Sequence, residues 1–124
     1  IPAGSISGLA GTTYTPTLTA VANVAASTAY VCQYMRVLST VTVSGKVDVD
    51  PTAGATLTKL GISLPIASAL ATEQQCAGTA YSVTPNYSGA IVGDAANDRA
   101  ELQFTTLVDV ANSSFFFQFT YLIV

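Results

Sequence analysis

Apolar and polar residues alternate with a period of two along most of this chain, and no window keeps the i, i+3, i+4, i+7 spacing of an amphipathic helix. The clearest alternation is in residues 41–49, where the polar positions are Thr42, Ser44, Lys46 and Asp48 and the intervening residues, Gly45 excepted, are valines. One face of such a strand is buried and the other is solvated. The pattern predicts an all-β protein.

The expected strands are short and are separated by residues that favour turns. They cover residues 12–21, 30–38, 41–49, 56–64, 76–84, 89–93, 100–107 and 114–123. Pro16 favours an edge position for the first strand because proline cannot donate to the ladder, and the Ser39-Thr40 link predicts a hairpin between the second and third. Residues 66–75 predict a loop or a single helical turn. About eight antiparallel strands at regular spacing are typical of a β-sandwich or jelly roll.

The length of 124 residues fits one domain with its own core. We assign residues 12–124 to this domain and residues 1–11, which are rich in Gly and Ser, to an extended N-terminal arm. The chain begins at Ile1 without an initiator Met or the pattern of a signal peptide, which predicts a processed chain or a fragment.

The last expected strand is apolar on both faces. One face carries Phe115, Phe117, Phe119, Tyr121 and Ile123, and the other carries Phe116, Leu122 and Val124. We expect the first face to pack in the core and the second to pack against sister copies in a homotrimer. The alternative is a central strand that its own chain covers on both sides.

Composition narrows the classes of partner. Half of the residues are apolar and 9% are charged, well below the roughly 25% of ordinary soluble domains. The net charge is −3 and the four cationic residues are scattered, so no basic patch is available for nucleic acid. No apolar run reaches the roughly 18 residues that cross a bilayer, so we expect no membrane insertion.

Candidate catalytic groups are few. Without His, the Ser-His-Asp and Cys-His arrangements and the common zinc sites cannot be built. Catalysis would depend on carboxylates, of which Asp48 and Asp50 share one side of a strand and Glu101 is a third. Asp50 precedes Pro51 and favours a turn instead. We therefore expect no enzyme activity, no metal and no cofactor.

Three further features leave alternatives open. Asp94, Asn97 and Asp98 could offer oxygens to calcium, but they are also ordinary turn residues and lack the D-x-D-x-D-G spacing. Arg99 could pair with Glu101 or with another subunit. The two cysteines permit either one disulfide or two free thiols in the core, and they are Cys32 and Cys76.

Several motifs resemble those of bacteriophage virion surface domains. Residues 34–47 resemble the hairpin "Y-x-R-V-G-N-x-V-T-V-x-G-x-V", with Ser39-Thr40 in place of the usual Gly-Asn turn. Residues 11–18 match "G-T-x-T-P-T-L", residues 60–65 resemble "L-x-I-S-L-P", and residues 76–80 resemble a "G-x-A" segment. The likeness covers most of the chain and includes tail-fibre, head-fibre and decoration domains.

The resemblance implies a compact, non-catalytic β domain, usually a homotrimer, mounted on the surface of a virion. The expected role is capsid decoration (cement) protein or head-fibre domain, with the major capsid protein or the fibre base as partner. The alternative is a distal tail-fibre domain that reads a host surface glycan through loops such as residues 73–77 or 86–89. We expect most tyrosines to serve packing rather than sugar binding.

Overall fold

The computed structural model describes residues 9–107 and 112–124. Within these ranges the chain forms one 3-10 turn, Glu73–Gln75, and ten strands. The strands are β1 (Leu9–Tyr14), β2 (Leu18–Ala22), β3 (Val24–Ala29), β4 (Cys32–Val37), β5 (Thr40–Pro51), β6 (Leu57–Ile62), β7 (Cys76–Ser82), β8 (Tyr87–Asp94), β9 (Arg99–Thr105) and β10 (Ser113–Leu122).

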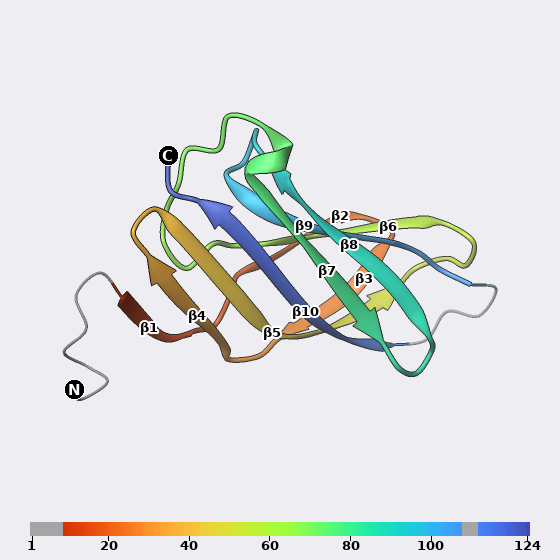
Figure 1. Cartoon of the computed structure of the whole chain (residues 1–124). Coiled ribbons are helices and arrows are strands. Elements are labelled where there is room, and N and C mark those ends of the chain that lie inside the picture. Colours follow the sequence, from red (N-terminus) through yellow and green to blue (C-terminus); the bar gives the residue numbers. More distant parts are fainter. Residues whose placement is uncertain (1–8, 108–111) are drawn as a thin grey trace.

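All strand pairs are antiparallel and belong to a single sheet with the order β1-β4-β5-β10-β7-β8-β9-β6-β2. β3 lies off this path and pairs with β5. The sheet curls into a half-barrel, and β5, β10, β7 and β8 run side by side across the view of Figure 1. The all-β antiparallel prediction is confirmed, whereas the sandwich or jelly roll stays a prediction.

The longest strand, β5, pairs with two strands along the same edge. Residues 40–44 pair with β4, and residues 47–51 pair with β3. Gly45 lies between the two ladders, where a Cβ atom would come within 2.7 Å of the Cys32 Cβ and closer still to its Sγ. Glycine therefore lets Cys32 pack against the middle of β5.

The core lies on the inner face of the curled sheet. The four valines of β5 are fully buried there, as the alternation predicted, together with Phe115, Phe117, Phe119 and Tyr121 of β10. Aromatic rings gather at one end of this core, with ring centroids 4.4 Å apart for Phe104 and Phe115 and 5.3 Å apart for Phe104 and Tyr87. Burial of these large side chains supplies most of the driving force for folding.

Several boundaries differ from the sequence expectation. β5 continues through Asp50 and Pro51, where the sequence favoured a turn, and these residues pair with β3. The expected strand 12–21 is divided into β1 and β2 by residues 15–17, and β1 already begins at Leu9, inside the expected arm. β3 was not expected. The β4–β5 turn is at Leu38-Ser39, one residue earlier than expected, and Leu38 has a positive φ of 54°. Residues 66–75 form a loop that ends in one 3-10 turn, as predicted.

The β2–β3 connection is fixed by one side chain. Asn23 has a positive φ of 57°, and its Nδ2 donates to the Ala53 carbonyl and to Thr58 Oγ1, both at 2.9 Å. The Ala53 amide donates to Asn23 Oδ1 at 2.8 Å in return. Asn23 thus ties the end of β2 to the loop between β5 and β6.

None of the helical segments in the described ranges has the length and apolar character needed to cross a membrane.

Candidate functional site

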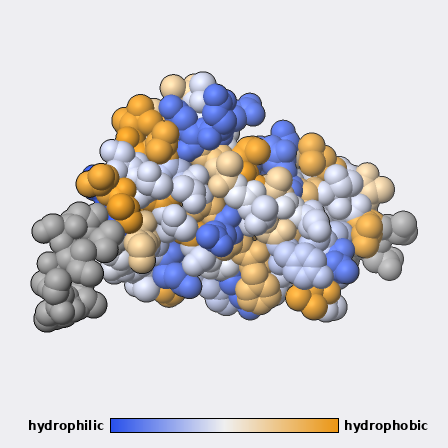
Figure 2. Space-filling view, viewed as in Figure 1, coloured by the Kyte–Doolittle hydropathy of each residue, from blue (hydrophilic) through white to orange (hydrophobic). Residues whose placement is uncertain are grey.

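The outer face of the sheet carries the exposed features that chemistry or recognition could use. On the middle strands its side chains are mostly small or neutral and polar, among them Thr42, Ser44, Thr79, Ala90, Gln118 and Thr120. Figure 2 views this side and shows pale surface with only scattered strongly hydrophilic or hydrophobic patches. Two groups of large apolar residues interrupt it.

The first group is the end patch, which we define as Val37, Leu38, Leu122 and Val124. Its members are between 43% and 73% exposed. Val37 and Leu122 both lie opposite Thr40 in their ladders, and the Ile123 amide donates to the Ser39 carbonyl at 2.7 Å. The C-terminus accordingly lies beside the β4–β5 hairpin in Figure 1, and hydrophobic atoms gather at the same corner in Figure 2.

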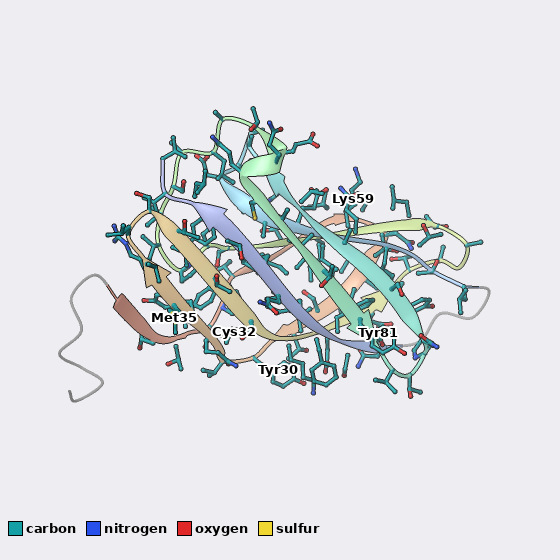
Figure 3. All side chains as sticks on the ribbon, in the orientation of Figure 1. Tyr30, Cys32, Met35, Lys59 and Tyr81 are labelled. Atoms are coloured by element: carbon teal, nitrogen blue, oxygen red, sulfur yellow. The ribbon has the colours of Figure 1, made fainter. Side chains whose placement is uncertain are left out.

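The second group is the aromatic patch, which we define as Tyr30, Tyr81 and Phe116. Phe116 lies directly opposite Lys46 on β5 and Tyr81 on β7. Phe116 is 54% exposed and Tyr81 is 45% exposed. Lys46 Nζ is 4.5 Å from the centre of the Tyr30 ring, a cation–π contact. Figure 3 shows Tyr30 and Tyr81 along the same lower side of the sheet.

The predicted trimer-interface residues are thus exposed but do not form one surface. Leu122 and Val124 belong to the end patch, whereas Phe116 lies six residues before Leu122, about 20 Å away along an extended strand. The alternative that the chain itself covers both faces of its last strand is wrong, because the outer residues of β10 are open to solvent.

Asp48 is held in place by its neighbours. Tyr30 Oη donates to Asp48 Oδ2 and Ser114 Oγ donates to Asp48 Oδ1, both at 2.6 Å. Partial burial works to raise the pKa of Asp48, but the bonds from Ser114 and Tyr30 and the nearby Lys46 charge outweigh it and hold the pKa below its ordinary value. Both carboxylate oxygens of Asp48 therefore accept hydrogen bonds, and Asp50 lies two residues further along on the same side of β5.

Asp94 and Asp98 build the β8–β9 turn, as the turn interpretation predicted. Asp94 Oδ2 accepts from Asn97 Nδ2 and from Arg99 Nε at 2.9 Å each, and Asp98 Oδ1 accepts from the Leu70 amide at 2.8 Å. Burial works to raise the pKa of Asp94, but the bonds from Asn97 and Arg99 lower it overall. In residues 9–107 and 112–124 no three His, Cys, Asp or Glu residues gather as a metal site would require.

Glu101 lines a hollow of about 310 Å³ that also includes Lys59, Glu73 and Asp94. Glu101 Oε1 accepts from Gln103 Nε2 at 2.7 Å and is 4.0 Å from Lys59 Nζ. Of the two pairings left open for Arg99, the one with Glu101 is not formed, because Arg99 lies at the β8–β9 turn directly opposite Asp94 and pairs with it. Three strands, β10, β7 and β8, separate Glu101 from Asp48. Glu101 is thus remote from Asp48 and Asp50, and the carboxylates that share a hollow with it are Asp94 and Glu73.

Cys32 and Cys76 are both buried free thiols, so the disulfide that the sequence permits is not formed. Cys32 belongs to β4 and Cys76 to β7, with β5 and β10 between them. They consequently do not face each other across a ladder, as a bridge between neighbouring strands requires. Burial raises the pKa of the Cys76 thiol to about 12, so it is uncharged and a poor nucleophile at neutral pH.

Shallow hollows open along the outer face. One of about 300 Å³ lies at the aromatic patch and is lined by Thr79, Ala80, Tyr81, Phe116, Phe117 and Gln118. A neighbouring one of about 460 Å³ is lined by Leu57, Ser88, Gly89, Ala90, Gln103, Phe104 and Thr105. A third, of about 610 Å³, lies across β1, β4 and β5 and includes Met35 and Gln33.

Sequence reasoning missed the exposure of Tyr30 and Tyr81 because it assigned most tyrosines to packing. That assignment is right for Tyr87 and Tyr121, which are buried. In β7 the inward positions are all small, namely Cys76, Gly78, Ala80 and Ser82, so hydrophobicity does not reveal which face of this strand is buried. Only its pairing with β10 places Tyr81 outside.

Comparison with family models, curated proteins and solved structures finds no match to this chain.

Proposed function

We propose that this chain is a non-catalytic structural domain of a bacteriophage particle, a homotrimeric jelly-roll-like β domain on the particle surface. In this role it acts as a capsid decoration (cement) protein or a head-fibre domain, attached to the major capsid protein or to the fibre base. The motif resemblance of residues 11–18, 34–47, 60–65 and 76–80 supports the phage assignment.

The end patch is the observation that carries the proposal. Four large apolar side chains are exposed at one end of the sheet, where Val37 of β4 and Leu122 of β10 lie on either side of Thr40 of β5. Contiguous apolar surface of this kind marks contact sites in soluble proteins. Burying it between copies would contribute roughly 25 cal/mol per Å² before the costs of association.

The charges of the molecule support an assembly role over a catalytic one. Arg36, beside the end patch, already donates from Nε to the Leu38 carbonyl at 2.7 Å. Asp48, Asp94 and Glu101 each have hydrogen-bond partners within the chain. A surface with few charges to desolvate is well suited to lasting contact with other subunits.

Light scattering on the purified chain tests the assembly. We expect a molar mass three times the 12.7 kDa of one chain at micromolar concentration, and a single-chain mass for Leu122→Asp, because the new carboxylate would be buried in the contact. Thr120→Asp is the matched control, since it adds the same charge to the same exposed face of β10, two residues from the end patch. Wild-type monomers, or Leu122→Asp trimers, would contradict the proposal.

The position on the particle needs a separate measurement. A low-resolution electron microscopy map of the intact virion, with the domain located by a bound antibody fragment, is expected to place it on the capsid or a head fibre. Density at the distal end of a tail fibre would instead show that the domain belongs to the host-recognition apparatus.

A further inference from the structure

The aromatic patch and the hollow beside it are not needed for the assembly described above. The hollow lies around Phe116 and Tyr81, far along β10 from the end patch. Two half-exposed aromatic side chains in the middle of a sheet, opposite each other in the β7–β10 ladder, need a physical explanation of their own.

The lining of the hollow is divided between two kinds of group. Phe116 and Tyr81 provide aromatic surface on one register row, and Gln118 and Thr79, opposite each other on the next, provide an amide and a hydroxyl. Across the part of the chain that the structure describes, the side chains of Gln118 and Thr79 take no hydrogen-bond partner. Amides and hydroxyls both donate and accept, which matches a ligand whose groups also do both.

The charged groups nearest to this hollow interact with each other and with neighbouring side chains outside it. Lys46, which faces Phe116, has its ammonium group over the Tyr30 ring and near Asp48, whose pKa it helps to lower. Asp48 in turn accepts hydrogen bonds from Tyr30 and Ser114. The lining itself contains no ionisable carboxylate, ammonium or guanidinium group. The complementary ligand is therefore uncharged.

We infer that the hollow between Tyr81, Phe116, Gln118 and Thr79 binds an uncharged oligosaccharide. One face of a pyranose ring presents C–H groups, whose partial positive charge is complementary to the negative face of an aromatic ring. The hydroxyls at the rim of the sugar reach Gln118 and Thr79, since ligand sites combine apolar surface with a few placed polar groups.

The second hollow indicates a chain of sugars rather than one. Thr79 lies opposite Ala90, and Ala90 lies opposite Gln103. The register row that starts at Gln118 therefore continues past the small, apolar Ala90 on β8 to the amide of Gln103 on β9, whose Nε2 donates to Glu101. Ser88, opposite Tyr81, leads into the same space of about 460 Å³. A ligand running across the strands can thus contact both hollows. The site differs from the loops at residues 73–77 and 86–89 that the sequence suggested for recognition.

A glycan array of neutral and acidic oligosaccharides, followed by calorimetric titration with the strongest neutral binder, tests the inference. We expect binding to neutral oligosaccharides, with weaker binding to the matching monosaccharide. Tyr81→Ala and Gln118→Ala should each weaken Kd by about tenfold, while Tyr81→Phe should bind nearly as wild type because it keeps the ring. Met35→Ala is the matched control, an exposed outer-face side chain at a different hollow.

Light scattering on the same variants distinguishes this site from the proposed assembly. Trimers of Tyr81→Ala with weakened sugar binding support the inference, whatever the result for Leu122→Asp. The inference is overturned by binding to acidic glycans only, by binding to no oligosaccharide on the array, or by unchanged affinity in Tyr81→Ala. It is equally overturned if Tyr81→Ala changes the molar mass, since the patch would then be a contact between copies.

Discussion

Gly45 shows how a single residue determines the packing of two strands. A Cβ atom at this position would overlap Cys32, with the Cys32 Cβ only 2.7 Å away. We expect Gly45→Ala to lower the free energy of unfolding by about 2 kcal/mol, the usual range for overpacking a core. Urea denaturation followed by fluorescence measures the change.

The overlap partner can be identified by a double-mutant cycle. Adding Cys32→Ala to the Gly45→Ala variant removes the sulfur and should recover part of the lost stability, so the two changes would couple by more than about 0.5 kcal/mol. Strictly additive effects would mean that Cys32 is not what the new methyl group meets. The valine alternation of β5 predicted its buried face correctly, but nothing local to residues 41–49 indicated that Gly45 makes room for a side chain 13 positions earlier.

At the scale of elements, the β2–β3 connection depends on Asn23. Asn23→Ala removes three hydrogen bonds to Ala53 and Thr58 and leaves a non-glycine residue at a φ of 57°. We expect a loss of about 3 kcal/mol in the free energy of unfolding. Asn23→Gly should lose about 1 kcal/mol less, because it removes the same bonds without the backbone strain. Equal losses in urea denaturation would show that the backbone conformation costs nothing.

Strands with one apolar and one more polar face were predictable from the sequence, and strands whose two faces are similar in hydrophobicity were not. β5 alternates strongly, β10 carries an aromatic residue at every second position from Phe115 to Tyr121, and the structure places these faces in the core. β3 consists of small residues that are mostly exposed, so its strand conformation comes from pairing with β5 rather than from any local pattern. The candidate site has the same limitation: it is assembled from β7 and β10, which only the sheet order brings together.

At the scale of the whole molecule, the scarcity of charge makes stability depend on few carboxylates. The pKa values of Asp48 and Asp94 both lie below their ordinary 3.8 in the folded chain. Groups whose pKa is lowered on folding contribute stability that is present above the unfolded pKa and lost as the pH falls through the folded one. Stability should therefore be nearly constant from about pH 8 to pH 5 and should decline below about pH 4.

The prediction is checked by measuring the urea midpoints of wild type and of the double variant Asp48→Asn/Asp94→Asn across this pH range. The variant should be less stable than wild type at pH 7. The difference should shrink in acid, because the two wild-type aspartates are then protonated and lose their stabilising charge, whereas the asparagines have no charge to lose. A wild-type midpoint that rises below pH 4, or a difference independent of pH, would contradict the assignment of these two carboxylates.

The sheet order also bears on how the chain reaches its native state during synthesis. β10 is the last strand to emerge, yet it is the one inserted between β5 and β7. While residues 113–122 are still inside the ribosome, both of those strands have an open edge facing an empty slot, and such edges are templates for pairing with other chains. The nascent protein is thus most prone to aggregation just before this segment is complete. Once the phenylalanine-rich strand β10 pairs with β5 and β7, it closes both edges in one step.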